Sequence, residues 1–182
     1  MANVNKIKIP EMKKQLKEFS QKELIGLVSD IYKLNQDVQH YLSVKFLGEE
    51  TIIGLFENAM REIKYEFFPD KGFGKMRLAK ARGAITNFKK LTNDHHRTIE
   101  LMVFYVETGT KFTTTYGDID ERFYDSMCSM YNKVVTECEK DKKLFYDFND
   151  RLYAIVVETE GMGWGYHDEL SYMYHSISWL DE

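Results

Sequence analysis

The sequence predicts an all-α protein of about seven helices in antiparallel hairpins, packed as a helical bundle or a short solenoid-like stack. Only 2 prolines interrupt a chain of 182 residues. Apolar residues recur at helical spacing along most of the chain, and no segment shows the alternation typical of a half-buried strand. A chain of this length buries about 70% of its unfolded surface. We therefore expect one helical domain over residues 1–182.

The first helices are predicted from local start and stop signals. Pro10 suits the first turn of a short helix, and residues 1–19 are expected to form a loosely attached N-terminal segment. Ser20 and Glu23 form a capping-box pattern directly before an apolar run. Asn35 is expected to interrupt that helix, so that a second one follows at once.

The later helices follow from apolar periodicity. They are expected at about residues 38–46, 52–68, 76–91, 94–116, 120–140, 143–160 and 167–179. Pro69 ends one of them, because the residue before a proline avoids the helical conformation. Residues 99–106 are apolar on nearly every side, which predicts a helix in the centre of its domain.

A possible internal repeat would pair two of these hairpins. The tripeptide Val-Glu-Thr occurs at residues 106–108 and again at 157–159. The separation of the two copies along the chain is near the repeat length of two-helix solenoid units. Hairpins 76–118 and 126–168 are therefore candidates for a duplication. Chance identity is the alternative. A duplication would favour a binding surface over a catalytic pocket.

A basic segment is the first candidate binding site. Residues 71–90 carry seven basic side chains and no acidic one, whereas the whole chain has a net charge of −4. Lys75, Arg82 and Lys89 recur every seven residues, and a stripe of this kind suits phosphates or an acidic partner. Arg77 falls near the apolar arc and would need a carboxylate if partly buried. The alternative, which charge runs favour, is a solvated face paired with acids elsewhere.

A glycine-rich corner is the second candidate. Three alternate glycines within residues 161–168 precede a helix, and their backbone N–H groups suit an anion. Trp164, Tyr166, His167 and Asp168 are its candidate binding residues. The spacing matches neither the dinucleotide fingerprint nor a Walker loop. The alternative is a packed interhelix turn with Trp164 inward and Asp168 as the helix cap.

Acidic residues give a third, weaker candidate. Asp118 and Asp120, together with His167 and Asp168, would form a metal or acid–base site if the two hairpin corners coincide. Asp118 and Glu121 are, however, spaced as a capping pair at a helix start. We therefore favour no metal, and we expect no cofactor.

Several segments together carry a family resemblance. They are residues 23–28, 77–91, 101–107, 111–127 and 161–168, and the resemblance extends over about residues 20–175. The chain resembles a family of uncharacterised bacterial proteins that is catalogued only as a domain of unknown function. The resemblance implies a bacterial, cytoplasmic and mostly helical protein, and it brings no catalytic residues.

These observations favour a non-enzymatic cytoplasmic interaction module that binds a protein or an anionic partner through a helical groove. The alternative is a metal-dependent or small-molecule enzyme with its site near Asp118, Asp120, His167 and Asp168. A pI near 5.8 disfavours a strongly electrostatic nucleic-acid binder. No apolar run approaches the roughly 20 residues of a membrane span, and we expect no membrane partner.

Overall fold

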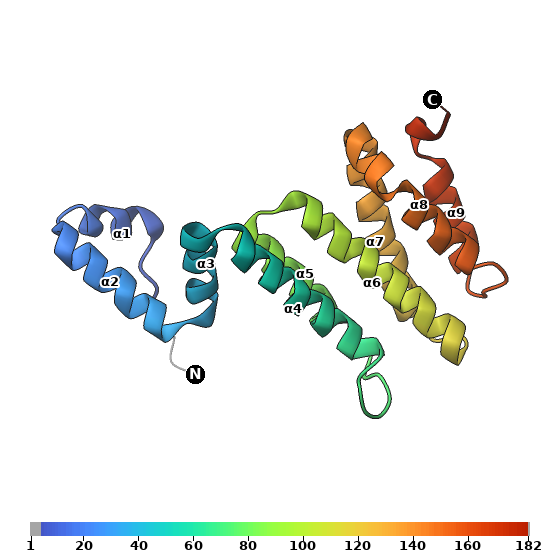
Figure 1. The fold of residues 1–182 in the computed structure, drawn as a ribbon, viewed down its shortest axis with the longest axis horizontal. Coiled ribbons are helices and arrows are strands. Elements are labelled where there is room, and N and C mark those ends of the chain that lie inside the picture. Colours follow the sequence, from blue (N-terminus) through green and yellow to red (C-terminus); the bar gives the residue numbers. More distant parts are fainter. Residues whose placement is uncertain (1–4, 182) are drawn as a thin grey trace. The chain divides into compact units, whose positions relative to one another are not determined.

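The computed structural model describes residues 5–181, which form nine α-helices and one 3₁₀ helix without any strand (Figure 1). The helices are α1 (Ile9–Leu16), α2 (Gln21–Leu34), α3 (Gln36–Leu47), α4 (Glu49–Phe67), α5 (Leu78–Thr92), α6 (His95–Tyr116), α7 (Glu121–Lys140), α8 (Lys142–Glu158) and α9 (Tyr166–His175), followed by η1 (Ser178–Asp181). The prediction of an all-α fold is confirmed. The described residues form nine α-helices, two more than the approximate total of seven, and each of them lies in a segment where apolar spacing or a capping signal predicted a helix.

The chain divides into two compact units, which we call the N-terminal unit (residues 1–48, with α1–α3) and the C-terminal unit (residues 49–182, with α4–α9). Of the predicted loose segment at residues 1–19, residues 1–4 lie outside the described part. The single domain and the duplicated hairpins 76–118 and 126–168 stay predictions.

Local capping signals form the helix boundaries of the N-terminal unit. The backbone N–H of Ser20 donates to Glu23 Oε2 at 2.7 Å, and the N–H of Glu23 donates to Ser20 Oγ at 3.3 Å, so the predicted capping box is present. Asn35 ends α2 and caps α3, because its Oδ1 accepts from the N–H groups of Asp37 and Val38. Packing contributes little here, since no described residue of this unit is buried.

The C-terminal unit is a helical bundle built around α6. This helix contacts α4, α5, α7 and α8, and buried residues cover most of its circumference, with one half-buried strip through Glu100, Phe104 and Glu107. The central position predicted from its apolar composition is confirmed. Phe67 from α4 is fully buried and packs edge-on against Tyr105, Phe112 and Phe123, with ring centroids 5.7–6.4 Å apart. Such aromatic pairs contribute about 0.5–1.5 kcal/mol each beyond their buried area.

Buried hydroxyl pairs join α6 to its neighbours. The pairs are Tyr105 with Ser126 at 2.8 Å, Thr110 with Tyr166 at 2.8 Å, and Thr113 with Tyr124 at 2.7 Å. The first two pairs satisfy hydroxyl groups that would otherwise be buried without a partner, at a cost of about 1–3 kcal/mol for each unsatisfied group. In the third pair, Thr113 also donates to the carbonyl oxygen of Gly117 and Tyr124 also donates to Asp118. These bonds set the register of α7 and α9 against α6.

The loop from α4 to α5 lies directly against the end of α4. The backbone N–H of Met76 donates to the carbonyl oxygen of Glu66 at 2.8 Å. A Cβ atom on Gly74 would lie 2.1 Å from the carbonyl oxygen of Phe67, so only glycine fits there. Gly83, in the middle of α5, has open space around its Cα.

A search of the described residues finds no helix with the length and the apolar content that crossing a bilayer requires.

We predict opposite effects for two glycine-to-alanine substitutions. Gly74→Ala should lower the free energy of unfolding by about 1–3 kcal/mol, because the new methyl group overlaps backbone that cannot turn aside. Gly83→Ala, the control, should raise it by about 0.5–1 kcal/mol, since alanine favours a helix interior. Urea denaturation measures both values. Equal stability of the two variants would contradict the packed loop.

Candidate functional site

The structure divides the predicted basic stripe. Because α5 begins at Leu78, Lys75 precedes the helix and lies in the α4–α5 loop, so the period of seven does not place it on the face of α5. The prediction that Lys75 lies in one stripe with Arg82 and Lys89 on the same helix is therefore wrong for Lys75. Met76, between Lys75 and the helix start, adopts a positive φ of 48°. Arg82 and Lys89 are exposed on the same side of α5, two turns apart.

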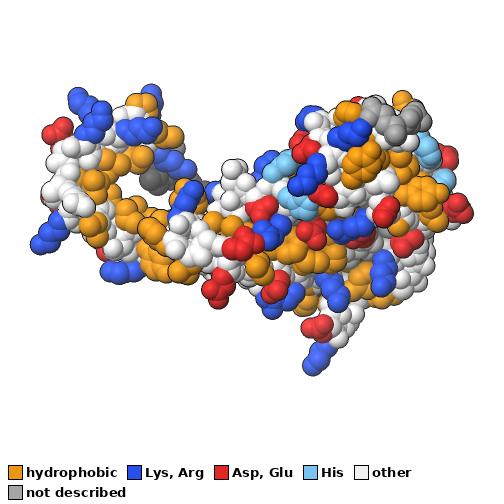
Figure 2. Space-filling view, turned by 45° about the horizontal axis from the view of Figure 1, so that its top comes forward, with side chains coloured by type: hydrophobic (Ala, Val, Ile, Leu, Met, Phe, Trp, Pro, Cys, Tyr) orange, Lys and Arg blue, Asp and Glu red, His pale blue; other side chains and the backbone are white. Residues whose placement is uncertain are grey.

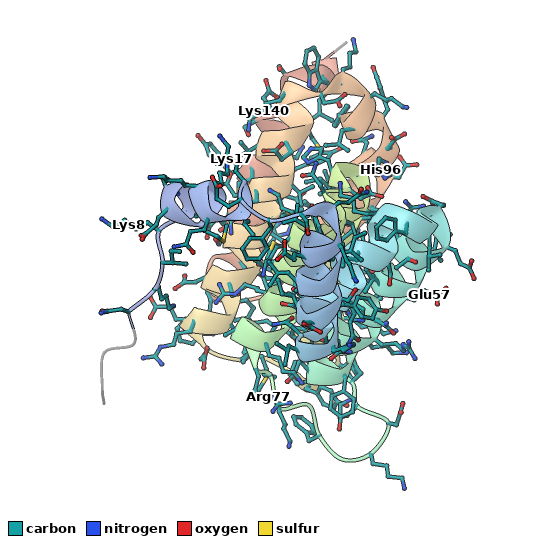
Figure 3. The ribbon with its side chains drawn as sticks, turned by 90° about the vertical axis from the view of Figure 1, so that its left-hand side faces the viewer. Lys8, Lys17, Glu57, Arg77, His96 and Lys140 are labelled. Carbon is teal, nitrogen blue, oxygen red and sulfur yellow. The ribbon has the colours of Figure 1, made fainter. Side chains whose placement is uncertain are left out.

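Arg77 is paired with a buried carboxylate within the protein, although 48% of its side chain is exposed. Its Nε lies 2.8 Å from Glu66 Oε2 and its Nη2 lies 2.9 Å from Oε1, and Lys80 Nζ lies 3.4 Å from the same carboxylate. Figure 3 shows Arg77 beside the loop that leads into α5. Glu66 is 1% exposed. The carboxylate expected for Arg77 is thus present, and the hydrogen bonds from Arg77 lower the pKa of Glu66 against the opposing effect of burial, with Lys80 adding to them.

A cleft of about 240 Å³ opens between α5, α6 and α7 of the C-terminal unit, and we call it the α5–α7 cleft. Its lining residues are Lys89 from α5, His95, Thr98, Ile99 and Met102 from α6, and Asn132, Lys133, Thr136 and Glu137 from α7. The cleft therefore combines the last basic residue of the predicted stripe with side chains about 40 residues further along the chain.

The charges of the cleft are unevenly paired. Glu137 Oε1 lies 2.8 Å from Lys140 Nζ, and Glu137 Oε2 lies 3.4 Å from His95 Nε2. The hydrogen bond from Lys140 lowers the pKa of Glu137, and the charges of His95 and Lys89 contribute to the same shift. Within residues 5–181, Lys89 and Lys133 have no carboxylate within ion-pair distance, and the charge of Lys89 acts on Glu137 only from further away.

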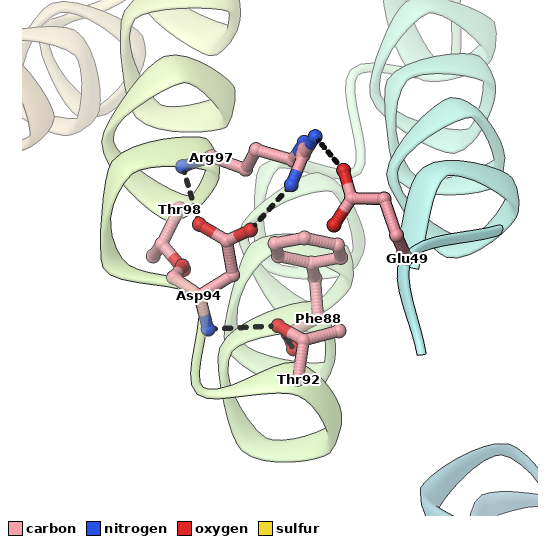
Figure 4. A network of polar contacts seen from close by, with 6 residues as sticks. All are labelled: Glu49, Phe88, Thr92, Asp94, Arg97 and Thr98. Carbon is pink, nitrogen blue, oxygen red and sulfur yellow. Dashed lines mark hydrogen bonds and ion pairs between the residues drawn. The ribbon is translucent and has the colours of Figure 1, made fainter. Parts of the chain in front are cut away.

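A polar network holds the start of α6, and with it one wall of the cleft (Figure 4). Arg97 Nη1 lies 2.7 Å from Asp94 Oδ2, and Arg97 Nη2 pairs with Glu49 at the start of α4. Asp94 Oδ1 also accepts from the backbone N–H of Arg97 at 3.0 Å, which caps α6. The backbone N–H of Asp94 donates to Thr92 Oγ1 at 3.1 Å, and the Thr92 hydroxyl donates to the carbonyl of Phe88. The network keeps the α5–α6 corner in one conformation.

The glycine-rich corner joins α8 to α9. Gly161, Trp164 and Gly165 all have positive φ angles, and Trp164 is 62% exposed. The alternative in which Trp164 packs inward is therefore wrong, because the left-handed backbone directs this side chain to solvent. Gly165 occupies the N-cap position of α9 in place of Asp168, which is exposed in the first turn of that helix.

Two other predicted binding residues of this corner are engaged inside the protein. Tyr166 is fully buried, and its hydroxyl bonds Thr110, so it offers no surface to a ligand. Burial raises the pKa of Tyr166. His167 Nδ1 lies 3.0 Å from Thr159 Oγ1 and 3.2 Å from the carbonyl oxygen of Val156. This ring therefore ties the start of α9 to the end of α8.

The corner between α6 and α7 lies beside the glycine-rich corner. A Cβ atom on Gly163 would lie 3.3 Å from Asp118 Oδ2, and Asp118 Oδ1 accepts from the Tyr124 hydroxyl at 3.1 Å. The predicted capping pair of Asp118 and Glu121 is wrong. Asp120 caps α7 instead, because its Oδ1 accepts from the N–H of Phe123 at 2.9 Å.

The metal alternative gains no cluster from this proximity. Among residues 5–181, no three His, Cys, Asp or Glu side chains converge in an arrangement that could hold a metal ion. The set Asp118, Asp120, His167 and Asp168 is therefore not assembled as a ligand group. Three of its members bond to the protein itself, and Asp168 is exposed in the first turn of α9.

Comparison with known proteins gives one match. A family model described as "Family of unknown function (DUF6155)" matches residues 7–178. The chain belongs to this family. No curated protein matches it, and no solved structure does. The resemblance drawn from the sequence is confirmed, and the function of this DUF6155 chain has to be argued from its own side chains.

The two cysteines of this DUF6155 protein are poorly suited to nucleophilic chemistry. Cys128 and Cys138 are free and buried. Burial raises the pKa of both thiols, to about 12 for Cys138. Because the thiolate is the reactive form, these side chains are inert near neutral pH.

We predict that the Glu66–Arg77 pair stabilises the fold in a pH-dependent way. Glu66→Gln should lower the free energy of unfolding by about 1–3 kcal/mol at neutral pH, because the charge-assisted bonds to Arg77 are lost. The folded pKa of Glu66 lies below its ordinary 4.5, so its contribution is complete above that pH and disappears as the pH falls through the folded pKa. The difference between wild type and variant should therefore shrink in acid.

Glu57→Gln is the matched control, since Glu57 is an exposed glutamate on the same helix. Urea denaturation from pH 7 to pH 3 measures both variants. A Glu66→Gln difference that stays constant over this range would contradict the assignment.

Proposed function

We propose that this chain is a non-enzymatic, cytoplasmic interaction module that binds an acidic protein segment, or another anionic partner, at the α5–α7 cleft. The observation that carries the proposal is the position of Lys89 and Lys133 on the same cleft, where the carboxylate of Glu137 already has Lys140 and His95 as partners. Two ammonium groups without an internal partner favour an external anion.

The size of the cleft supports a partner that inserts one group. Ligand pockets for whole small molecules commonly enclose about 300–1,000 Å³, whereas this cleft holds about 240 Å³. Ile99 and Met102 supply an apolar wall, and Asn132 and Thr136 supply polar groups. This combination suits a carboxylate or phosphate group carried by a larger molecule.

The surface of α5 carries a further cationic side chain outside the cleft. Arg82 lies seven residues before Lys89, which corresponds to about 10 Å along the helix axis. Arg82 is exposed and makes no ion pair within the described residues. An extended acidic segment anchored at Lys89 would therefore reach a second cation after about three residues of its own.

The enzyme alternative has less support. Its proposed residues, Asp118, Asp120, His167 and Asp168, form no described metal cluster, and three of them bond within the fold. Charge pairing at the α5–α7 cleft, in contrast, is incomplete. Binding is for this reason the function that we propose.

A titration with two defined probes tests the proposal. The probes are a synthetic hexaglutamate peptide and inorganic phosphate, and binding is followed by amide chemical shifts in a ¹⁵N spectrum. We expect saturable shifts at Lys89, His95 and Lys133. The double variant Lys89→Glu/Lys133→Glu should weaken peptide binding at least tenfold, which corresponds to about 1.4 kcal/mol. Added salt should weaken the wild-type interaction.

The double variant Lys64→Glu/Lys111→Glu is the matched control, because both lysines are exposed, lie outside the cleft and change the net charge equally. It should bind like the wild type apart from a small general charge effect. Absence of saturable shifts at the cleft, or an equal loss in both double variants, would refute the proposal.

A further inference from the structure

The N-terminal unit contains an apolar groove that the proposed function does not use. It has a volume of about 430 Å³ and lies between α2 and α3. Its lining residues are Val28, Ser29, Tyr32 and Lys33 from α2, and Leu42, Ser43, Phe46 and Leu47 from α3. Figure 2 shows hydrophobic side chains gathered along the hollowed side of this unit. We call it the α2–α3 groove.

The groove has the surface pattern of a helix-packing site. On α2, Val28 and Tyr32 are four residues apart, and on α3 the same spacing separates Leu42 and Phe46. Residues at this spacing form a ridge along a helix, and the space between two such ridges accepts the ridge of another helix. The two walls, formed in this way by four large side chains, therefore fit a third helix better than a flat or extended ligand.

Among residues 5–48, no other part of the N-terminal unit covers the large side chains of α3 at this groove. Phe46 is 80% exposed and Leu47 is 69% exposed. Monomeric proteins rarely leave large contiguous apolar patches exposed, and a unit of this size cannot build a sufficient core alone. Because apolar side chains of both α2 and α3 are exposed at the same groove, we infer that another molecule or segment binds there.

Charge decides what kind of helix fits. Residues 1–48 carry 8 lysines against 5 acidic residues, a net charge of +3, whereas residues 49–182 carry −7. The groove lining includes Lys33 and no acidic residue. Lys33 has only a weak internal partner, Asp30 at 3.5 Å, and both side chains are more than 70% exposed. An acidic occupant would be attracted to this surface.

Charge disfavours one other occupant, and geometry disfavours two more. Pairing of this groove with the groove of a second copy would bring two +3 units together, and docking on the acidic unit of a second copy would be a heterologous contact that tends to form open chains. An anionic membrane surface would match the charge, but amphipathic helices enter a bilayer with an exposed apolar face and not with a concave groove.

We propose that the α2–α3 groove binds an amphipathic helix with an acidic polar face, supplied by a partner protein. Val28, Tyr32 and Phe46 contact the apolar side of that helix, and Lys33 pairs with a carboxylate on its rim. This mode of recognition, a helix laid into a groove, depends on apolar anchors at three- and four-residue spacing. The inference uses a different surface from the α5–α7 cleft and goes beyond the proposed function.

Three synthetic helices of 18 residues test the proposal with the full-length chain. The first helix has a leucine–alanine face and a glutamate face. The second has the same leucine–alanine face and a lysine face. The third contains the residues of the first in an order that destroys the apolar stripe. Fluorescence anisotropy measures binding. We expect the acidic amphipathic helix to bind at least tenfold more tightly than either of the others.

Two variants locate the site. Phe46→Ser should weaken binding of the acidic helix at least tenfold, and it should leave the fold intact because Phe46 is 80% exposed. Tyr153→Ser is the matched control, an exposed aromatic residue on α8, and it should bind normally. Lys33→Glu should weaken the acidic helix and strengthen the lysine helix. Lys89→Glu/Lys133→Glu removes the cations of the cleft and should still bind the acidic amphipathic helix at least tenfold more tightly than its reordered counterpart, because only the groove selects the apolar stripe; this separates the proposal from the cleft.

Other results would overturn the proposal. Equal binding of all three helices, or no effect of Phe46→Ser, would show that the groove does not select an acidic helix. A dimer in sedimentation velocity that Phe46→Ser dissociates would assign the groove to a second copy. Binding to phosphatidylserine vesicles that Phe46→Ser removes, in the absence of helix binding, would assign it to a membrane surface.

Discussion

Burial of most of the surface of α6 is the constraint on which the C-terminal unit depends. Its apolar residues require neighbours over most of its circumference, and α4, α5, α7 and α8 supply them. Its buried hydroxyl groups then limit how those neighbours can slide. Thr110 needs Tyr166 and Tyr105 needs Ser126, because an unsatisfied hydroxyl in this core would cost about 1–3 kcal/mol. Apolar burial thus provides the driving force, and hydrogen bonding provides the register.

The α5–α7 cleft is a consequence of that register. Lys89 and Lys133 are 44 residues apart in sequence, and both border the cleft because α5 and α7 pack beside the start of α6. The bonds of Arg97 to Asp94 and Glu49 keep that start in place. A binding surface built on three packed helices holds its cations at defined positions, which a lysine-rich loop would not do.

The two units differ in how their helices are stabilised. The buried residues that the structure describes belong to the C-terminal unit, whereas α1, α2 and α3 have none and rely on caps such as Ser20 and Asn35. Isolated helices of this length are marginal in water. A ligand stabilises the folded state to which it binds. A partner helix in the α2–α3 groove would therefore stabilise the folded N-terminal unit.

The sequence by itself determined the helices, most of their ends and the central place of α6, because capping patterns and apolar periodicity act over a few residues. It also indicated Lys89 as a candidate and the need of Arg77 for a carboxylate. Only the tertiary structure decided which carboxylate that is, that Lys133 borders the same cleft, and that Asp120 rather than Asp118 caps α7. The partner of Arg77 and the position of Lys133 depend on side chains that only packing brings together, whereas the cap is local, and the choice between Asp118 and Asp120 followed from where the helix begins.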